Sequence, residues 1–184
     1  MIQNPASRPL LLIGGGAGSG KTSLARALAD NIPGAGLVHL DLCYHQDVDL
    51  APSTPRLDGQ PGHAIDFSDP QALGPARVKA ALDMHAGAPL VVVEGIFALA
   101  LPELREQASW SFFVDTPADL RVVRKTIRKI SEGKDPLPGL LGYANTVRAF
   151  DTHIEPTRAQ ADIVLDGTQP IADLAAQVLK RLKP

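Results

Sequence analysis

A glycine-rich segment directly after an apolar run constrains the fold more than any other part of the chain. Residues 15–22 read GGAGSGKT and match the pattern G-x-x-x-x-G-K-[ST] at every defined position. The apolar run 10–13 precedes this segment, and an Ala/Leu-rich stretch follows it, as in a strand–loop–helix unit. Glycines allow backbone angles that direct successive N–H groups at an anion near a helix N-terminus. A turn that only joins strand to helix is the alternative, but the Lys-Thr pair favours nucleoside triphosphate binding.

Side chains in and after this segment have predicted roles in that binding. We expect Lys21 to reach the β- and γ-phosphates and the Thr22 hydroxyl to bind Mg²⁺. The predicted nucleotide-binding residues are Gly15, Gly16, Ala17, Gly18, Ser19, Gly20, Lys21, Thr22 and Ser23.

Strand-like and helix-like runs alternate along the rest of the chain. The predicted strands are 10–13, 37–41, 90–93, 111–114 and 163–165. The predicted helices cover about 20–31, 70–86 and 171–182, and another begins at Thr116 as N-cap of a capping box with Asp119. This alternation predicts an α/β fold with a parallel sheet covered on both faces. We expect one domain over residues 1–184, with a long Pro/Gly/Asp-rich loop at about 42–69.

Composition excludes several classes of protein. The chain has 18 Lys and Arg and 20 Asp and Glu, so its net charge of −2 gives no overall attraction to nucleic acid or anionic membranes. The single cysteine, Cys43, excludes a disulfide framework. No apolar run approaches the roughly 18 residues of a membrane span, and no apolar stretch of signal-peptide type follows the first nine residues. We therefore expect a cytoplasmic location; a homo-oligomer stays open.

Two acidic residues stand at the carboxyl ends of predicted strands, where open α/β sheets bind ligands. Glu94 follows the strand at 90–93 and is suited to hold Mg²⁺ directly or through water. Asp41 ends the strand at 37–41 and could accept a hydrogen bond from an acceptor hydroxyl. The alternative is that one of them only caps a loop. His39 points to the same side as Asp41, and we interpret it as a packed or polar-edge residue.

A basic helix is predicted between Arg121 and Lys134. Helical spacing puts one set of cations on a stripe, with apolar residues opposite, so we expect the apolar side to be buried and the cations to point outward. The stripe contains Arg121, Arg124 and Arg128, with Lys125 and Lys129 beside it; the apolar side contains Leu120, Val123, Ile127 and Ile130. This pattern predicts the lid of a phosphotransferase at about 124–139. A solvated face and a nucleic-acid patch are the alternatives.

The near-neutral total charge is the sum of two segments with opposite net charge. Residues 39–69 contain six Asp and one Arg, whereas residues 121–134 contain six cations and one acid. An acidic acceptor loop and a basic lid are expected where a hydroxyl-rich substrate meets a polyphosphate.

The motifs together resemble those of the uridine kinase/phosphoribulokinase-like P-loop kinases. The similar segments include residues 15–22, 41–44, 93–97, 114–121, 146–148, 155–157 and 161–164. The resemblance implies a five-stranded parallel sheet of nucleoside-kinase type, a small helical lid, ATP as donor and Mg²⁺ as metal. It also implies a catalytic acid at Asp41, a substrate-side tyrosine at Tyr44 and a metal-linked glutamate at Glu94. Lid and substrate-side arginines match Arg121, Arg124 and Arg128.

Two departures from the family pattern concern the acceptor. Where the family has a Phe-Asp-His-Pro-like stretch, residues 66–70 place Ser68 at the ribose-gripping position, with Asp66 and Asp69 close by. A segment that recognises the pyrimidine in uridine kinases has no counterpart before Glu94.

Our hypothesis is therefore an ATP- and Mg²⁺-dependent kinase acting on a hydroxyl of a small metabolite, such as a nucleoside or another sugar-containing compound. The catalytic residues would be Lys21, Asp41, Arg124 and Arg128; the substrate residues Asp41, Tyr44, Asp66, Ser68, Asp69 and Arg121; and the metal ligands Thr22 and Glu94. The alternatives are a P-loop nucleotide-binding switch or accessory ATPase, and a pantothenate- or nicotinamide-riboside-like kinase.

Overall fold

The computed structural model describes residues 8–56 and 60–182. The first seven residues, which bear on the expectation of no secretory signal, and Asp58 of the acidic loop lie outside the described residues. Among the helices of the described chain, none has both the length and the apolar character needed to cross a bilayer.

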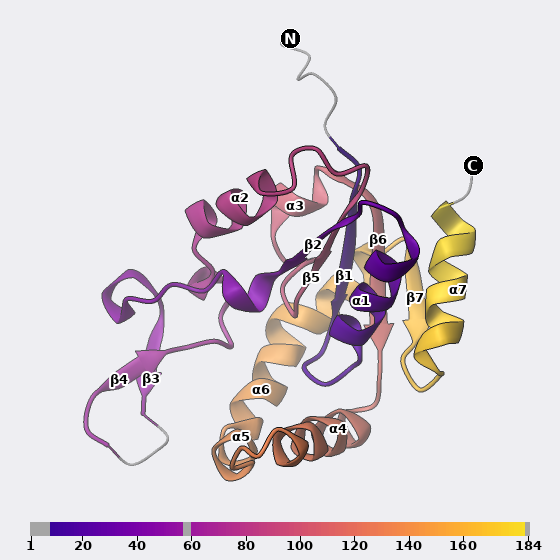
Figure 1. The fold of residues 1–184 in the computed structure, drawn as a ribbon. Coiled ribbons are helices and arrows are strands. Elements are labelled where there is room, and N and C mark those ends of the chain that lie inside the picture. Colours follow the sequence, from indigo (N-terminus) through magenta and orange to yellow (C-terminus); the bar gives the residue numbers. More distant parts are fainter. Residues whose placement is uncertain (1–7, 57–59, 183–184) are drawn as a thin grey trace.

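The centre of the protein is the predicted parallel sheet. Its five strands are arranged in the order β2-β5-β1-β6-β7, and every neighbouring pair is parallel (Figure 1). All six residues of β1 are buried, because β5 and β6 flank this strand and helices cover both faces. The strands are β1 (Leu10–Gly15), β2 (Gly36–His39), β5 (Val91–Glu94), β6 (Ala108–Asp115) and β7 (Ile163–Asp166).

Helices cover the two faces of this sheet. On one face, α1 (Lys21–Asn31) and α7 (Ile171–Leu182) pack together over an apolar cluster that includes Leu11, Ile13 and Phe112. On the other face, α2 (Pro75–Asp83) and α3 (Pro102–Arg105) enclose a second cluster with Leu10, Leu12 and Phe113. A series of helices follows β6: α4 (Ala118–Ser131), α5 (Leu137–Leu141), α6 (Tyr143–Ala149), the π-helix η4 (Phe150–Ile154) and the 3₁₀-helix η5 (Glu155–Gln160).

The predicted loop at 42–69 contains more structure than we expected. It includes the 3₁₀-helix η2 (Val48–Leu50) and an antiparallel hairpin of β3 (Ser53–Pro55) and β4 (His63–Ile65) (Figure 1). Strands of three residues are too short to give a readable alternation of apolar and polar positions. The 3₁₀-helix η1 (Leu40–Leu42) precedes this loop and η3 (Pro70–Ala72) follows it.

The predicted capping box at Thr116 is wrong. Helix α4 begins at Ala118, its N-cap is Pro117, and no side chain caps it. The Thr116 hydroxyl is buried and donates to the carbonyl of Ser19 at 3.1 Å. The hydroxyl therefore joins the end of β6 to the glycine-rich loop, so it is not available to the helix terminus.

The predicted orientation of α4 is also wrong, because its apolar side is not buried. The exposed fractions are 37% for Leu120, 51% for Val123, 61% for Ile127 and 60% for Ile130, whereas Arg121 is buried. Arg121 therefore points into the protein, whereas the apolar residues are exposed together with Arg124 and Arg128.

The packing of the sheet gives a first prediction. Phe113 is completely buried in β6, so Phe113→Ala should lower the free energy of unfolding by about 3–5 kcal/mol. Chemical denaturation followed by circular dichroism measures this change. The control is Met84→Ala, because Met84 is 83% exposed and its truncation should be nearly neutral. Equal stability of the two variants would contradict the assigned core.

Candidate active site

The glycine-rich loop between β1 and α1 requires its glycines. Gly15, Gly18 and Gly20 have positive φ angles of 132°, 84° and 104°. A Cβ added to Gly18 would lie 2.4 Å from the backbone oxygen of Arg121. The loop therefore fits closely against α4 as well as adopting left-handed backbone angles.

Lys21 lies inside this loop and is 5% exposed. Its Nζ donates to the carbonyl oxygen of Gly16 at 2.9 Å. Burial lowers the pKa of Lys21 from its ordinary value, while the nearby carboxylates of Glu94 and Asp41 oppose this shift. The ammonium group and the two predicted acids are therefore close enough to interact electrostatically.

Glu94 connects three elements at the carboxyl edge of the sheet. Its carboxylate is 3% exposed, and Oε1 accepts a hydrogen bond from Thr22 Oγ1 of α1 at 3.0 Å. His39 Nδ1 at the end of β2 lies 2.7 Å from the same oxygen. Sequence reasoning placed His39 at a polar edge and missed this contact, since it requires β2 and β5 to be neighbours with His39 opposite Glu94.

The polar groups around the loop suit a magnesium–nucleotide complex. Thr22 and Glu94 offer two adjacent oxygen ligands, and Mg²⁺ commonly uses one or two carboxylates together with substrate phosphates. The Ser19 hydroxyl is buried without a hydrogen-bond partner. Among the described residues, no group of three or more His, Cys, Asp or Glu is placed to bind a metal.

Asp41 and Tyr44, two predicted acceptor residues, follow β2 in the chain. Asp41 lies in η1 and is exposed. The Tyr44 hydroxyl donates to the carbonyl of Phe67 at 3.3 Å, and the two rings meet edge to face at 5.0 Å. Burial raises the pKa of Tyr44, and Asp41 and Asp66 raise it further. These three polar side chains therefore lie near one another.

The other predicted acceptor residues shape a turn. Asp66 Oδ1 accepts hydrogen bonds from the backbone N–H of Ser68, at 3.0 Å, and from the Ser68 hydroxyl. Asp69 Oδ1 accepts from the N–H of Gln71 at 2.8 Å and caps η3. Some of the oxygens predicted to contact substrate are thus already bonded within the loop.

Arg121 lies beneath the phosphate loop rather than open to solvent. It is 3% exposed, its Nε donates to Thr116 O at 3.0 Å, and its guanidinium lies 4.0 Å from the centre of the Phe150 ring. A Cβ on Gly16 would lie 2.1 Å from Arg121 Nη1. The side chain therefore joins α4 to the loop and to η4.

The remaining predicted cations lie further along α4. Arg124 Nη1 donates to Gly167 O after β7, at 2.8 Å. Arg128 is exposed and lowers the pKa of Lys21 by electrostatic repulsion. Burial lowers the pKa of Lys125, helped by Arg128 and Lys129 and opposed by Asp41. The structure thus brings Lys21, Asp41, Lys125 and Arg128 within electrostatic range.

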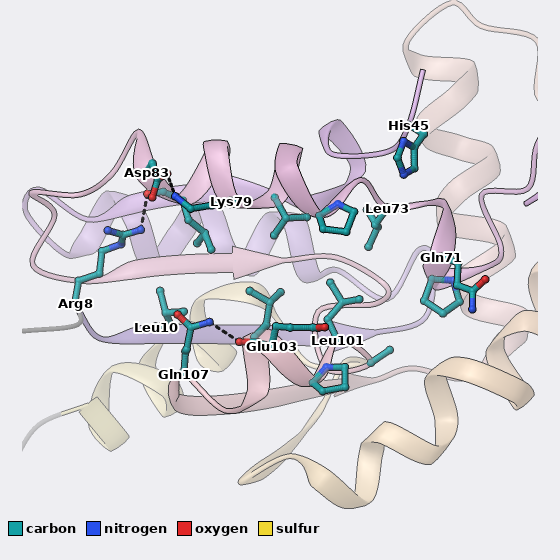
Figure 2. A pocket seen from close by; sticks show the side chains of 17 residues that line it. Arg8, Leu10, His45, Gln71, Leu73, Lys79, Asp83, Leu101, Glu103 and Gln107 are labelled. Atoms are coloured by element: carbon teal, nitrogen blue, oxygen red, sulfur yellow. Dashed lines mark hydrogen bonds and ion pairs between the residues drawn. The ribbon is translucent and has the colours of Figure 1, made fainter. Parts of the chain in front are cut away.

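A large cavity lies away from these groups. Its volume is about 1010 Å³, and it runs between α2 and α3 (Figure 2). None of the predicted site residues lines it. Several of its polar side chains are already paired locally: Lys79 with Asp83, Arg8 with Leu82 O, and Gln107 with Glu103 O. The candidate active site is therefore the group of polar residues around the phosphate loop, and not this cavity.

Comparison with known proteins shows the family of the chain. Residues 61–172 match the model of the phosphoribulokinase/uridine kinase family, and residues 2–47, which contain the phosphate loop, match the zeta toxin model. A uridine kinase from Bacillus anthracis is 30% identical, with 95% of this chain and 93% of that protein covered. The chain belongs to the phosphoribulokinase/uridine kinase family. It is an ATP-dependent small-molecule kinase. A uridine kinase from Deinococcus deserti is also 30% identical, over 86% of this chain and 87% of that protein.

Solved structures show the same fold at lower sequence identity. A shikimate kinase from Bacteroides thetaiotaomicron has a TM-score of 0.59 at 18% identity, covering 96% of this chain and 99% of that one. A gluconokinase from Sinorhizobium meliloti has a TM-score of 0.59 at 19% identity, covering 95% and 92%. The α/β fold of P-loop kinases is therefore confirmed.

The close fit between the phosphate loop and α4 gives the next prediction. Gly18→Ala introduces a side chain at φ 84° and 2.4 Å from Arg121 O, so the loop must shift. If the strain of about 1–3 kcal/mol is lost from binding, ATP affinity should fall about 5- to 150-fold. Isothermal titration calorimetry measures the affinity, with Gly87→Ala as control because nothing lies within 4 Å of the added Cβ there. Unchanged binding by the Gly18 variant would contradict the role of this loop.

Proposed function

We propose that the protein transfers the γ-phosphoryl group of ATP, bound with Mg²⁺, to a hydroxyl of a small sugar-containing metabolite such as a nucleoside. The observation that carries this proposal is that Lys21, Asp41 and Glu94 follow or end β1, β2 and β5, which are neighbouring parallel strands, and that Glu94 accepts a hydrogen bond from Thr22 beside Lys21. The 30% identity to uridine kinases supports a nucleoside-like acceptor.

The donor phosphates would bind in the loop at 15–22. Backbone N–H groups and the Lys21 ammonium would hold the β- and γ-phosphates, as in other P-loop proteins. Thr22 and Glu94 would hold the magnesium ion, which supplies charge neutralisation across the phosphate oxygens. The unpartnered Ser19 hydroxyl supports a polar ligand at this loop.

Asp41 would orient the acceptor hydroxyl. The predicted strand end at Asp41 is wrong, because β2 ends at His39 and Asp41 lies in η1, but Asp41 is exposed there and opposes the lowering of the Lys21 pKa that burial causes, which supports a place beside the phosphate site. Phosphoryl transfer passes through a loose transition state, and placing the attacking oxygen in line therefore matters more than strong basicity.

Cations of α4 would stabilise the charge on the transferring group. Arg128 acts electrostatically on Lys21, and Lys125 interacts with Asp41 across the site. Arg124 could do so if its guanidinium left Gly167 O. Arg121 is largely occupied by Thr116 and Phe150, so its contribution would be to position α4 rather than to grip substrate.

The chain is shorter than the alignment with one of its relatives. The match to the Bacillus anthracis uridine kinase extends over 198 aligned positions, more than the 184 residues of this chain, so residues of the relative have no counterpart here. Asp66 and Ser68 are bonded to each other beside Tyr44. We therefore propose a hydroxyl-bearing acceptor without committing it to uridine.

A panel assay tests the proposal. ADP release is coupled to NADH oxidation while nucleosides, pentose phosphates, pantothenate and nicotinamide riboside are supplied one at a time. We expect one class of acceptor to stimulate ADP release and to appear phosphorylated by mass spectrometry. Hydrolysis of ATP at one rate with every acceptor would instead support a nucleotide-dependent switch.

Asp41→Asn provides a prediction for the transfer step. Loss of the carboxylate should lower kcat by about 10²–10⁴-fold, the usual contribution of a positioned acid or base, and should leave ATP affinity nearly unchanged. The matched control is Asp49→Asn, an exposed acid in η2 of the same loop, which should retain activity. Near-normal turnover by the Asp41 variant would refute the assignment.

His39 gives a separate prediction for the metal-linked glutamate. His39→Ala removes the contact with Glu94 Oε1, so we expect Mg²⁺ to strengthen the binding of a non-hydrolysable ATP analogue about tenfold less than in the wild type. Titrations with Mg²⁺ and with EDTA measure this difference. His39→Asn can restore a donor toward Glu94 and should recover part of the effect, which a purely structural defect would not. Equal Mg²⁺ dependence in all three proteins would exclude a role for His39 in positioning Glu94.

A further inference from the structure

The cavity between α2 and α3 takes no part in the phosphate chemistry proposed above, because none of the predicted site residues lines it. Its volume of about 1010 Å³ is similar to that of the largest small-molecule sites, which reach about 1,000 Å³. In Figure 2, Arg8 and Asp83 lie at one end of the cavity, whereas His45 and Gln71 lie at the other. The cavity therefore has room for a ligand of its own.

The floor of the cavity is apolar. Its side chains come from four segments of the chain: Leu10 from β1, Leu73 from the segment before α2, Val78 from α2 and Leu104 from α3. These side chains are only 2–7% exposed although they line the cavity. Apolar groups of a ligand would leave water against them, which favours binding. The floor therefore suits a ligand with an apolar body.

Three of the charged residues around the cavity are exposed to solvent. Lys79 and Asp83 of α2 form an ion pair one helical turn apart and neutralise each other. Glu103, in the first turn of α3, is exposed as well. Because water weakens the interactions of exposed charges, these three residues contribute little to the choice of a ligand.

Arg8 differs from these residues because it is half-buried and has no ionic partner. Its Nη2 donates to Leu82 O at 2.7 Å, and its Nε is buried without a hydrogen-bond partner. Among the described residues, no carboxylate forms an ion pair with its guanidinium. A guanidinium has more N–H donors than this one bond uses, so donors remain for a ligand. Charge complementarity therefore favours a negative group at this end of the cavity.

We propose that this cavity binds a small monocarboxylate with an apolar body, such as an aromatic or medium-chain acid. The carboxylate accepts hydrogen bonds from the Arg8 guanidinium, whose planar fork matches a carboxylate. The apolar body lies along the floor formed by Leu10, Val78 and Leu104. One cation matches one negative charge, whereas a phosphate group with two charges would need further donors. The site is separate from the phosphate loop, so the proposal does not depend on the acceptor or on the transfer chemistry.

A fluorescent probe tests the site in the wild type. We expect 1-anilinonaphthalene-8-sulfonate, an apolar monoanion, to bind with a saturable rise in fluorescence. 4-Phenylbutyrate should displace this dye, and 4-phenyl-1-butanol, which has the same apolar body without the charge, should need at least about ten times the concentration. A non-hydrolysable ATP analogue with Mg²⁺ should leave the dye bound, since the residues of the phosphate loop do not line the cavity.

Two variants test whether the probe occupies the cavity. Arg8→Gln should weaken the binding of 4-phenylbutyrate about 10- to 150-fold, the usual contribution of a hydrogen bond to a charged group, and leave that of 4-phenyl-1-butanol unchanged. The matched control is Arg181→Gln, an exposed arginine of α7 on the opposite face of the sheet. Ala100→Phe adds a ring at a half-buried position that lines the cavity, so it should abolish binding of the dye. Circular dichroism verifies that the three variants fold.

Several results would overturn the proposal. Equal displacement of the dye by the acid and the alcohol would show that the cavity does not select a negative charge. Equal affinity of the wild type and Arg8→Gln for 4-phenylbutyrate would exclude Arg8 as the partner of the carboxylate. Displacement by the ATP analogue would assign the dye to the phosphate loop, and loss of dye binding as the protein concentration rises would assign the cavity to contact between copies of the chain.

Discussion

The carboxylate of Glu94 is the interaction on which the arrangement of the site depends. A nearly buried carboxylate needs hydrogen-bond partners, and here they come from two other elements, Thr22 of α1 and His39 of β2. The three elements reach the same point because β2 and β1 both pair with β5. Displacing α1 or β2 would take away one of the two partners of this nearly buried carboxylate, so the hydrogen bonds at the sheet edge also fix the geometry around the phosphate loop.

The buried cation Arg121 fixes the orientation of α4 in a comparable way. Arg121 is held by Thr116, by the Phe150 ring and by the close approach of Gly16 and Gly18. Once this residue faces the loop, the helical repeat turns Lys125 toward the site as well. The same repeat forces Val123 and Ile127 to the outside. The orientation of α4, opposite to the predicted one, is therefore a consequence of one buried arginine. The apolar side could reach the core only if Arg121 left its buried position.

Local patterns were sufficient to predict the sheet and the phosphate loop. Apolar runs gave the strands, and the GGAGSGKT segment gave the loop between β1 and α1, because both signals lie within a few consecutive residues. The errors arose where a residue responds to a distant partner. Thr116 was predicted to cap a helix, but its hydroxyl donates to the carbonyl of Ser19, 97 positions away. His39 was interpreted as a packed or polar-edge residue, and its contact with Glu94 depends on the pairing of β2 with β5. The direction that α4 faces could not be read from its own amphipathic pattern, since either side can be buried when an arginine has a site to occupy.

The segment that contains the β3–β4 hairpin has a consequence for how this kinase can change during evolution. The two flanks of this segment are joined by backbone hydrogen bonds, from His45 N–H to Ala72 O and from Gly74 N–H to Cys43 O, both 2.9 Å long. Backbone bonds do not depend on the side chains of the residues that lie between them. These residues can therefore be exchanged, inserted or deleted while Asp41 and α2 keep their places. Under the function proposed above, a change of acceptor would need changes in this segment alone.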